Sequence, residues 1–325
     1  MILITGATGF IGSHLVEAVR ARGEAVRCLI RRDVSRRRHS YALPPEAEVV
    51  FGDLMSGEGI SAALEGVDSV IHLAGVTKAL SIRAFYAGNV RATENLAKSL
   101  VGRTVQLVHV SSLAAIGPSL DGTPVTEDAE PHPLTHYGKS KLEGERIVRA
   151  LLPDAMIVRP PVVYGPRDTD VLEMFRSISK GFVMEISGGE RRFQAIYVKD
   201  LAEGLLAAAC ARHPAGHTYF LAHPKAVSWS ELSSTAARIM NKRPKIMSIP
   251  SPLAYIAGGS AEIWSRLTGK PGIVSREKVR EAQCRYWTCD TRRASQELGF
   301  EARTPLDLGL AQTLTWYKEA GWLKY

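Results

Sequence analysis

Hydrophobic and polar positions in the first half of the chain follow two alternating patterns. Short continuous apolar runs are typical of buried strands, and apolar residues every three or four positions are typical of helices that cover a sheet. The chain opens with an apolar run at 1–7, and the stretch Gly12–Gly23 then places Leu15, Val16 and Val19 on one helical face. A second run at 25–31 completes a strand–helix–strand unit of about thirty residues.

The same alternation continues to about residue 165. Further strand-like runs are 48–54, 68–75, 105–117 and 155–165, and further helical stretches are 60–67, 85–101 and 137–152. Helices interleaved with buried strands predict an α/β fold, with a Rossmann-type, doubly wound parallel sheet covered on both faces.

Beyond residue 165 the pattern loosens, and we expect a smaller, discontinuous C-terminal lobe. Helical stretches at 169–181 and 229–242 lie among loops with Pro and Gly, whereas 194–209 resembles a return to the first domain. The predicted division is a Rossmann domain at 1–165, with 194–222 returning to it, and a second lobe formed mostly by 166–193 and 223–325.

Composition is that of an ordinary globular protein, with 45% hydrophobic and 23% charged residues. No apolar run reaches the roughly 20 residues of a membrane span, because the most apolar late stretch, 251–264, contains Pro, Gly and Glu262. No charged leader precedes the first strand, so we expect no signal peptide.

Cysteine usage indicates a reducing compartment. The four cysteines form no CxxC pair and have no histidines clustered around them; they are Cys28, Cys210, Cys284 and Cys289. We therefore expect reduced, buried thiols, no metal site and a cytoplasmic location.

A local excess of positive charge accounts for much of the net charge of +8. Seven basic residues fall within thirteen positions: Arg27, Arg31, Arg32, Arg36, Arg37, Arg38 and His39. Such clusters attract phosphates, but no aromatic residue or recognition motif accompanies this one, so we expect no nucleic-acid partner. Arg36–Arg38 are expected in a solvated loop.

Glycines at the end of the first predicted strand form the first candidate site. Gly6, Gly9 and Gly12 stand at the turn into the first helix. Glycines let a pyrophosphate approach the backbone, and the free N–H groups and dipole of a helix N-terminus stabilise the anion. The motif predicts a dinucleotide, although glycine turns also follow strands for structural reasons alone.

Tyr137 and Lys141 form the second candidate site, because a spacing of four places them on one face of a helix. A nearby ammonium lowers the pKa of a phenol, which can then exchange a proton with a substrate hydroxyl or carbonyl. Ser111 and Ser112 end the preceding strand, where the crevice of a parallel sheet binds ligands. This order of turn, serine and Tyr/Lys pair suits a single active site.

These motifs resemble those of the extended short-chain dehydrogenases/reductases, the NAD-dependent epimerase/dehydratase superfamily. The matching segments, in the family's order, are TGATGFIG, GDL, HLAG, NVRATENL, VSSLAAIG, YGKSK, RPPVVYGP and IYVKDLAEGL. The later RPPVVYGPRD and REKVREAQCRYWTCD segments are most similar to the branch of 3β-hydroxysteroid dehydrogenases and dihydroflavonol reductases.

The resemblance implies a role for each matching residue. The catalytic residues would be Ser112, Tyr137 and Lys141. Residues at the cofactor would be Gly6, Gly9, Phe10, Ile11 and Gly12 at the pyrophosphate, Asp53 and Leu54 at adenine, Leu73, Ala74 and Gly75 along the ribose and phosphates, Lys141 with Tyr137 at the nicotinamide ribose, and Pro160–Val163 at the nicotinamide. Asn89 would support the site, or simply bond a neighbouring backbone group.

The second strand bears on the choice of cofactor. Relatives that prefer NAD resemble one another in an acidic residue at its end, where this chain has Ile30 followed by Arg31 and Arg32. A guanidinium pairs well with a 2′-phosphate, so we expect NADP, with NAD as the alternative.

Two reactions remain open at this stage. A dehydrogenase or reductase would transfer hydride between the nicotinamide and a carbonyl or hydroxyl carbon of a bulky, cyclic substrate. A nucleotide-sugar epimerase or dehydratase would use a tightly bound cofactor, and its diphosphate-binding Arg is replaced here by Phe193, with Arg192 and Arg280 as the nearest substitutes. A cofactor-sensing protein is a third possibility, which the Ser112, Tyr137 and Lys141 set disfavours.

The substrate pocket and assembly are also predicted. Apolar residues of the second lobe, such as Met174, Phe175, Tyr255 and Trp264, are candidates for the pocket wall, or for plain core. The resemblance implies a homodimer formed through paired helices.

Overall fold

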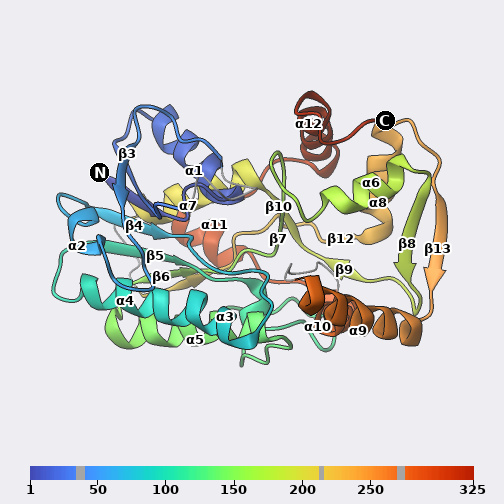
Figure 1. Ribbon diagram of the computed structural model, residues 1–325, viewed down its shortest axis with the longest axis horizontal. Coiled ribbons are helices and arrows are strands. Elements are labelled where there is room, and N and C mark those ends of the chain that lie inside the picture. The colour runs from blue at the N-terminus through green and yellow to red at the C-terminus, as the bar shows by residue number, and fades with distance from the viewer. Residues whose placement is uncertain (34–40, 212–215, 269–274) are drawn as a thin grey trace.

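The computed structural model describes residues 1–33, 41–211, 216–268 and 275–325, apart from the side chains of Ile263 and Arg266. The basic residues at 36–39 lie outside the described residues. Seven parallel strands form the main sheet, in the order β11-β6-β5-β4-β1-β2-β3 (Figure 1). They are β1 Ile2–Thr5, β2 Val26–Ile30, β3 Glu48–Phe51, β4 Ser69–His72, β5 Gln106–Val110, β6 Met156–Val158 and β11 Thr218–Tyr219. This is the predicted doubly wound α/β fold.

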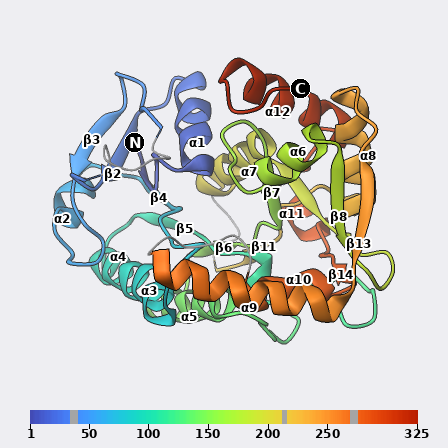
Figure 2. The same ribbon diagram turned by 45° about the vertical axis from the view of Figure 1, so that its right-hand side comes forward.

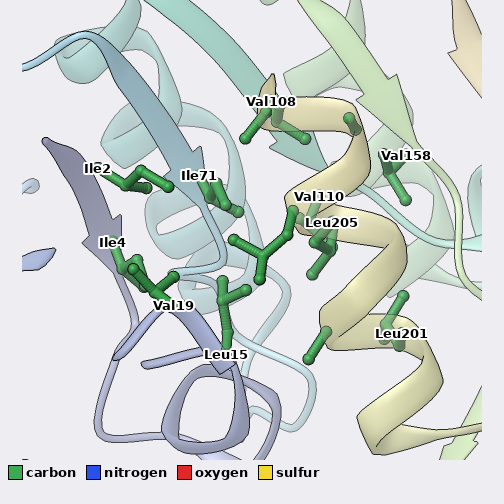
Figure 3. Packing of buried hydrophobic residues seen from close by; sticks show 14 of the residues in the cluster. Ile2, Ile4, Leu15, Val19, Ile71, Val108, Val110, Val158, Leu201 and Leu205 are labelled. Atoms are coloured by element: carbon green, nitrogen blue, oxygen red, sulfur yellow. The ribbon is translucent and has the colours of Figure 1, made fainter. Parts of the chain in front are cut away.

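Helices cover both faces of the sheet. On one face lie α1 Phe10–Ala21, α7 Val198–Cys210 and α11 Arg292–Leu298, and on the other α2 Ile60–Ala63, α4 Ala92–Leu100 and α5 His136–Leu151. Leu15 and Leu205 meet Ile4 and Ile71 of the sheet in a fully buried core (Figure 3). Burial of each such side chain stabilises the fold by about 1.5–3 kcal/mol.

Three predicted elements are divided in the structure. The run 155–165 separates into β6 and β7 Val162–Tyr164 at Pro160 and Pro161, because proline cannot donate a ladder hydrogen bond. The run 105–117 ends as a strand at Val110 and continues as the 3₁₀ turn Leu113–Ala115. The single helix predicted at 85–101 is divided into α3 Ile82–Tyr86, a π-helical turn at Ala87–Arg91, and α4.

The second lobe combines small sheets with helices (Figure 2). Its strand sets are β7 with β10 Ala195–Tyr197, β8 Phe182–Ile186 with β13 Lys245–Ile249, and β9 Arg192–Phe193 between β12 Val227–Ser228 and β14 Tyr286–Trp287. Its helices are α6 Leu172–Ser179, α8 Trp229–Ile239, α9 Ser251–Thr268, α10 Arg276–Gln283 and α12 Leu306–Glu319. Phe175, Leu232, Leu314 and Tyr317 form its core. The exact division into domains stays a prediction.

The cysteines are less uniformly buried than expected. Cys28 and Cys289 are buried, but Cys210 at the end of α7 is exposed and Cys284 after α10 is half-buried. Among the helices of the described residues, none combines the length and the apolar character needed to cross a membrane.

Candidate active site

The glycine turn lies between β1 and α1, at the carboxyl edge of the sheet. Gly6 has φ +76°, a conformation that other residues rarely adopt. A Cβ on Gly12 would come within 2.2 Å of the Gly6 carbonyl oxygen. Gly9 caps α1 without a side-chain hydrogen bond, and the first turn holds no acidic residue. The Gly9 N–H already donates to the Gly6 carbonyl at 3.0 Å, so the N–H groups of the first turn of α1 are the ones that fit a dinucleotide pyrophosphate.

Residues predicted at the adenosine end follow β2 and β3. Arg31 comes directly after β2, with its Nε 3.5 Å from the Asp33 carboxylate. The Arg32 guanidinium lies 5.2 Å from the centre of the Phe51 ring. Asp53 accepts a 2.7 Å hydrogen bond from the Met55 N–H, and the buried Leu54 belongs to the core.

A cavity of about 590 Å³ lies between the carboxyl edge of the sheet and the second lobe. Predicted site residues in its lining are Phe10, Ile11, Leu73, Gly75, Asn89, Ser112, Tyr137, Lys141, Pro160 and Val163. The remaining predicted residues stand outside the lining: Gly6, Gly9, Gly12, Arg31, Arg32, Asp53, Leu54 and Ala74. The cavity thus joins the predicted catalytic residues to the predicted nicotinamide wall.

Tyr137 and Lys141 lie one turn apart at the start of α5, which Thr135 caps by accepting the Gly138 N–H at 3.1 Å. Burial raises the pKa of Tyr137, while the Ser112 hydroxyl and the charge of Lys278 act to lower it. Lys141 donates a 2.7 Å hydrogen bond to the Val110 carbonyl, and burial lowers its pKa to about 8. Tyr137 is therefore a protonated donor at neutral pH.

The two serines after β5 have different surroundings. Ser112 caps the 3₁₀ turn, and its hydroxyl accepts the Ala114 N–H at 3.1 Å. The Ser111 hydroxyl is buried, lines the cavity and has no hydrogen-bond partner within the described part of the chain. Both serines line the cavity together with Tyr137.

Asn89 is buried in the π-helical turn, and its side chain hydrogen-bonds other groups of the protein. Its amide accepts the Val76 N–H at 2.7 Å and donates to the Val76 carbonyl and the Ser140 hydroxyl, both at 2.9 Å. The residue thus fixes the loop after β4 against α5. The bonding to neighbouring backbone considered for Asn89 is present, and its support of the site stays a prediction.

Helix α10 meets the start of α5 in contacts that sequence reasoning missed. Glu277 accepts the His136 N–H at 3.1 and 3.2 Å, and Glu281 accepts the Thr135 hydroxyl at 3.1 Å. Lys278 lies 5.9 Å from the centre of the Tyr137 ring and donates to Glu281 at 2.6 Å. The spacing of Glu277 and Glu281 marks one helical face, but nothing in the sequence names its partner.

The second-lobe wall of the cavity is rich in aromatic residues. Phe193 stacks on Trp229 with ring centres 4.3 Å apart, and Met174 and Trp287 extend the surface. Phe175 is core against Tyr317, which is the second of the two roles considered for it. Tyr255 and Trp264 on α9 lie outside the lining. Helical spacing shows which residues share a face, but it does not show whether that face packs in the core, points outward or lines a pocket.

Every cationic side chain in the described lining already has a partner. Lys141 bonds Val110, Lys78 pairs with Asp170, Lys278 with Glu281 and Arg192 with Glu190, and Arg191 donates to the carbonyls of Ile186 and Ser187. Arg280 lies outside the lining and bonds the Tyr255 hydroxyl at 3.2 Å.

Comparison with known proteins agrees with this geometry. The model of the NAD dependent epimerase/dehydratase family matches residues 2–222. A ceramide reductase of Caulobacter vibrioides is 34% identical, over 99% of this chain and 96% of that protein. A 4-hydroxy-2-methyl-3-oxo-4-farnesyl-3,4-dihydroquinoline-1-oxide ketoreductase of Stigmatella aurantiaca is 28% identical, over 94% and 93%. The solved structure of MoeE5 in complex with UDP-glucose and NAD superposes with a TM-score of 0.78 at 27% identity, over 98% and 99%.

Proposed function

The chain belongs to the NAD-dependent epimerase/dehydratase family, and from that premise we propose that it reduces a ketone on a bulky, largely apolar substrate with NADPH. The similar proteins include a ceramide reductase and a farnesyl-substituted quinoline ketoreductase, so long-chain lipid ketones are the first substrates to test, beside cyclic ketones. The reaction converts a ketone, NADPH and a proton into a secondary alcohol and NADP⁺.

The observation that carries this proposal is the second-lobe wall. Phe193 and Trp229 present an aromatic surface where a sugar-nucleotide enzyme would place its diphosphate-binding Arg. Loss of such a partner removes charge-assisted hydrogen bonds worth about 1.5–3 kcal/mol each. An apolar chain or ring gains from the same surface through burial.

The residues of the site then have defined tasks. A bound nicotinamide supplies the hydride. Tyr137 donates its phenolic proton to the developing alkoxide, and Ser112 hydrogen-bonds the same oxygen. Lys141, which bonds the Val110 carbonyl, would hold the cofactor ribose, and it keeps its ammonium charge below a pKa of about 8. Its charge also favours the tyrosinate left after proton transfer.

NADPH is proposed because Arg31 stands directly after β2, where its guanidinium can pair with a 2′-phosphate in place of the Asp33 carboxylate. Calorimetric titration should show tighter binding of NADP(H) than of NAD(H), and the Arg31→Ala variant should lose that preference while keeping NAD(H) affinity. Equal affinities in the unmodified protein would contradict this choice of cofactor.

We also propose that the protein is a homodimer in the cytoplasm. Sedimentation velocity can test the dimer, and cell fractionation can test the location.

The alternative is a nucleotide-sugar epimerase or dehydratase, which the likeness to MoeE5 with UDP-glucose and NAD keeps open. In that reading a diphosphate would be bound by Arg192, which now pairs with Glu190, or by Arg280, which now bonds the Tyr255 hydroxyl. Titration with UDP-glucose distinguishes the readings, because we expect no binding at millimolar concentration. Micromolar binding that Arg192→Ala abolishes would favour the alternative.

A further inference from the structure

Helix α9 carries an apolar stripe on its outer face. Leu253, Ile256, Trp264 and Leu267 are 57, 64, 69 and 77% exposed. At 100° per residue these four positions fall within an arc of about 80°, and at 1.5 Å per residue they extend along about 21 Å of the helix. The stripe consists of two apolar pairs, because the exposed Ser260 lies within the same arc between Ile256 and Trp264. Large apolar residues exposed together on one face mark an interaction site.

The opposite face of α9 already has its partner. Gly258 and Gly259 approach Ser275 and Arg276 of the α10 region closely, and Tyr255 lies beneath Arg276 and Arg280. Figure 2 shows α9 along the outside of the molecule beside α10. The small residues of α9 therefore face the protein, and its large apolar residues face outward.

Two strands at the far end of the second lobe expose further apolar residues (Figure 1). Met247 of β13 is 55% exposed, and Met184, paired with it on β8, is 59% exposed. Ile246 is 65% exposed but points to the other face of the strand, because successive strand residues alternate. The α9 surface is hereafter the set of four residues on the helix: Leu253, Ile256, Trp264 and Leu267.

Positive charge is concentrated in the same part of the sequence. Residues 242–270 contain five basic residues and one acidic residue, and so carry four of the eight net positive charges of the chain. The basic residues are Lys242, Arg243, Lys245, Arg266 and Lys270, and the acidic one is Glu262. The later basic residues of α10 lie over Tyr255 or line the cavity. Apolar residues with Trp, flanked by Lys and Arg, are typical of segments that lie in the interface of anionic bilayers.

We propose that the α9 surface binds a bilayer containing anionic lipids, with α9 lying in the interface. Helix α10, which packs on α9, supplies Lys278, Glu281 and Ala282 to the cavity wall, so the bilayer would lie beside the active site. The proposed lipid substrate could then pass between membrane and cavity without crossing water. Binding to the bilayer is independent of that chemistry, and only this route to the cavity rests on the proposed function.

The test is co-sedimentation of the full-length protein with large vesicles. Vesicles of phosphatidylcholine with 30% phosphatidylglycerol should bind the protein. Neutral phosphatidylcholine vesicles should bind it with at least tenfold lower affinity. The double variant Trp264→Glu/Leu267→Glu should lose at least tenfold in affinity for the anionic vesicles. Its matched control is Val101→Glu/Leu308→Glu, which adds the same charges at exposed apolar positions of 54 and 49% outside this surface and should bind normally.

Three results would overturn the proposal: no binding to anionic vesicles, an equal loss in the control variant, or binding that the α9 variant retains. If the α9 variant instead turns a dimer into a monomer in sedimentation velocity and vesicles do not bind, a second copy of the chain covers this surface. Reduction of a short-chain, water-soluble ketone without vesicles separates the two proposals. Vesicle binding without any ketone reduction would contradict only the proposed function, and reduction without vesicle binding only this inference.

Discussion

Tyr137 is the residue on which the proposed chemistry depends most directly. Tyr137→Phe removes only the hydroxyl, so the fold and NADPH affinity should persist while turnover falls by roughly 10²–10⁴. Steady-state kinetics together with calorimetric titration of NADPH check this. Ser111→Ala is a useful comparison, because it removes a buried neighbouring hydroxyl without touching the phenol. Turnover of Tyr137→Phe at the normal rate would show that another group transfers the proton.

Lys278 should tune Tyr137 from the second lobe. The charged groups acting on the phenol include Lys278 and Glu281 of α10 and Asp170 of the loop before α6, with Lys141 one turn along α5. Loss of the Lys278 cation disfavours the tyrosinate, so the Tyr137 pKa should rise. In alcohol oxidation, where tyrosinate is the base, Lys278→Met should shift the pH–rate profile upward by about one unit. Lys278→Arg should leave it nearly unchanged, and an unshifted profile in the Met variant would exclude this role.

At the scale of elements, β4 and β5 hold two buried histidines side by side. His72 and His109 are in register, with ring centres 5.4 Å apart. Burial lowers the pKa of His72 to about 3, so it is neutral in the folded protein at pH 5, whereas the unfolded chain binds a proton below about 6.5. Because the unfolded state then binds more protons, stability is lost as pH falls from 6.5 toward 3.

This linkage predicts a pH-dependent free energy of unfolding. Between pH 7 and pH 5, His72 should account for a loss of about 2 kcal/mol, measured by urea unfolding. His72→Gln, which can still hydrogen-bond Thr5 and Thr93, should reduce that pH dependence by the same amount even if its overall stability is lower. An identical pH dependence in the two proteins would show that His72 is already charged in the fold.

The contact between α5 and α10 shows where sequence reasoning stops at this scale. Tyr137 and Lys141 are joined by helical spacing, so their proximity is predictable from local pattern. Glu277 and His136 are 141 positions apart, and no periodicity specifies which helix end a distant carboxylate will contact. The same limit applies to Phe193 and Trp229, whose stacking depends on how β9 meets the start of α8.

At the scale of the whole molecule, the Rossmann sheet is predictable because each buried strand and its covering helix carry their own hydrophobic period. The second lobe is less predictable from the sequence, since its two- and three-stranded sheets arise from pairings between distant segments. Trp264 illustrates the difference, because an aromatic residue that suits a pocket wall lies instead on the outer face of α9. The make-up of the cavity wall therefore becomes visible only in the folded chain.

The central claim, a net reduction of an apolar ketone, is tested most directly by following cofactor and substrate together. The purified protein is incubated with NADPH and a ketone analogue of a ceramide, absorbance is read at 340 nm, and the lipid is analysed by mass spectrometry. We predict one NADPH consumed for each alcohol formed, a product two mass units heavier than the ketone, and no turnover in Tyr137→Phe. Conversion of UDP-glucose to an isomer with no net change at 340 nm, and no reduction of the ketone, would contradict the account.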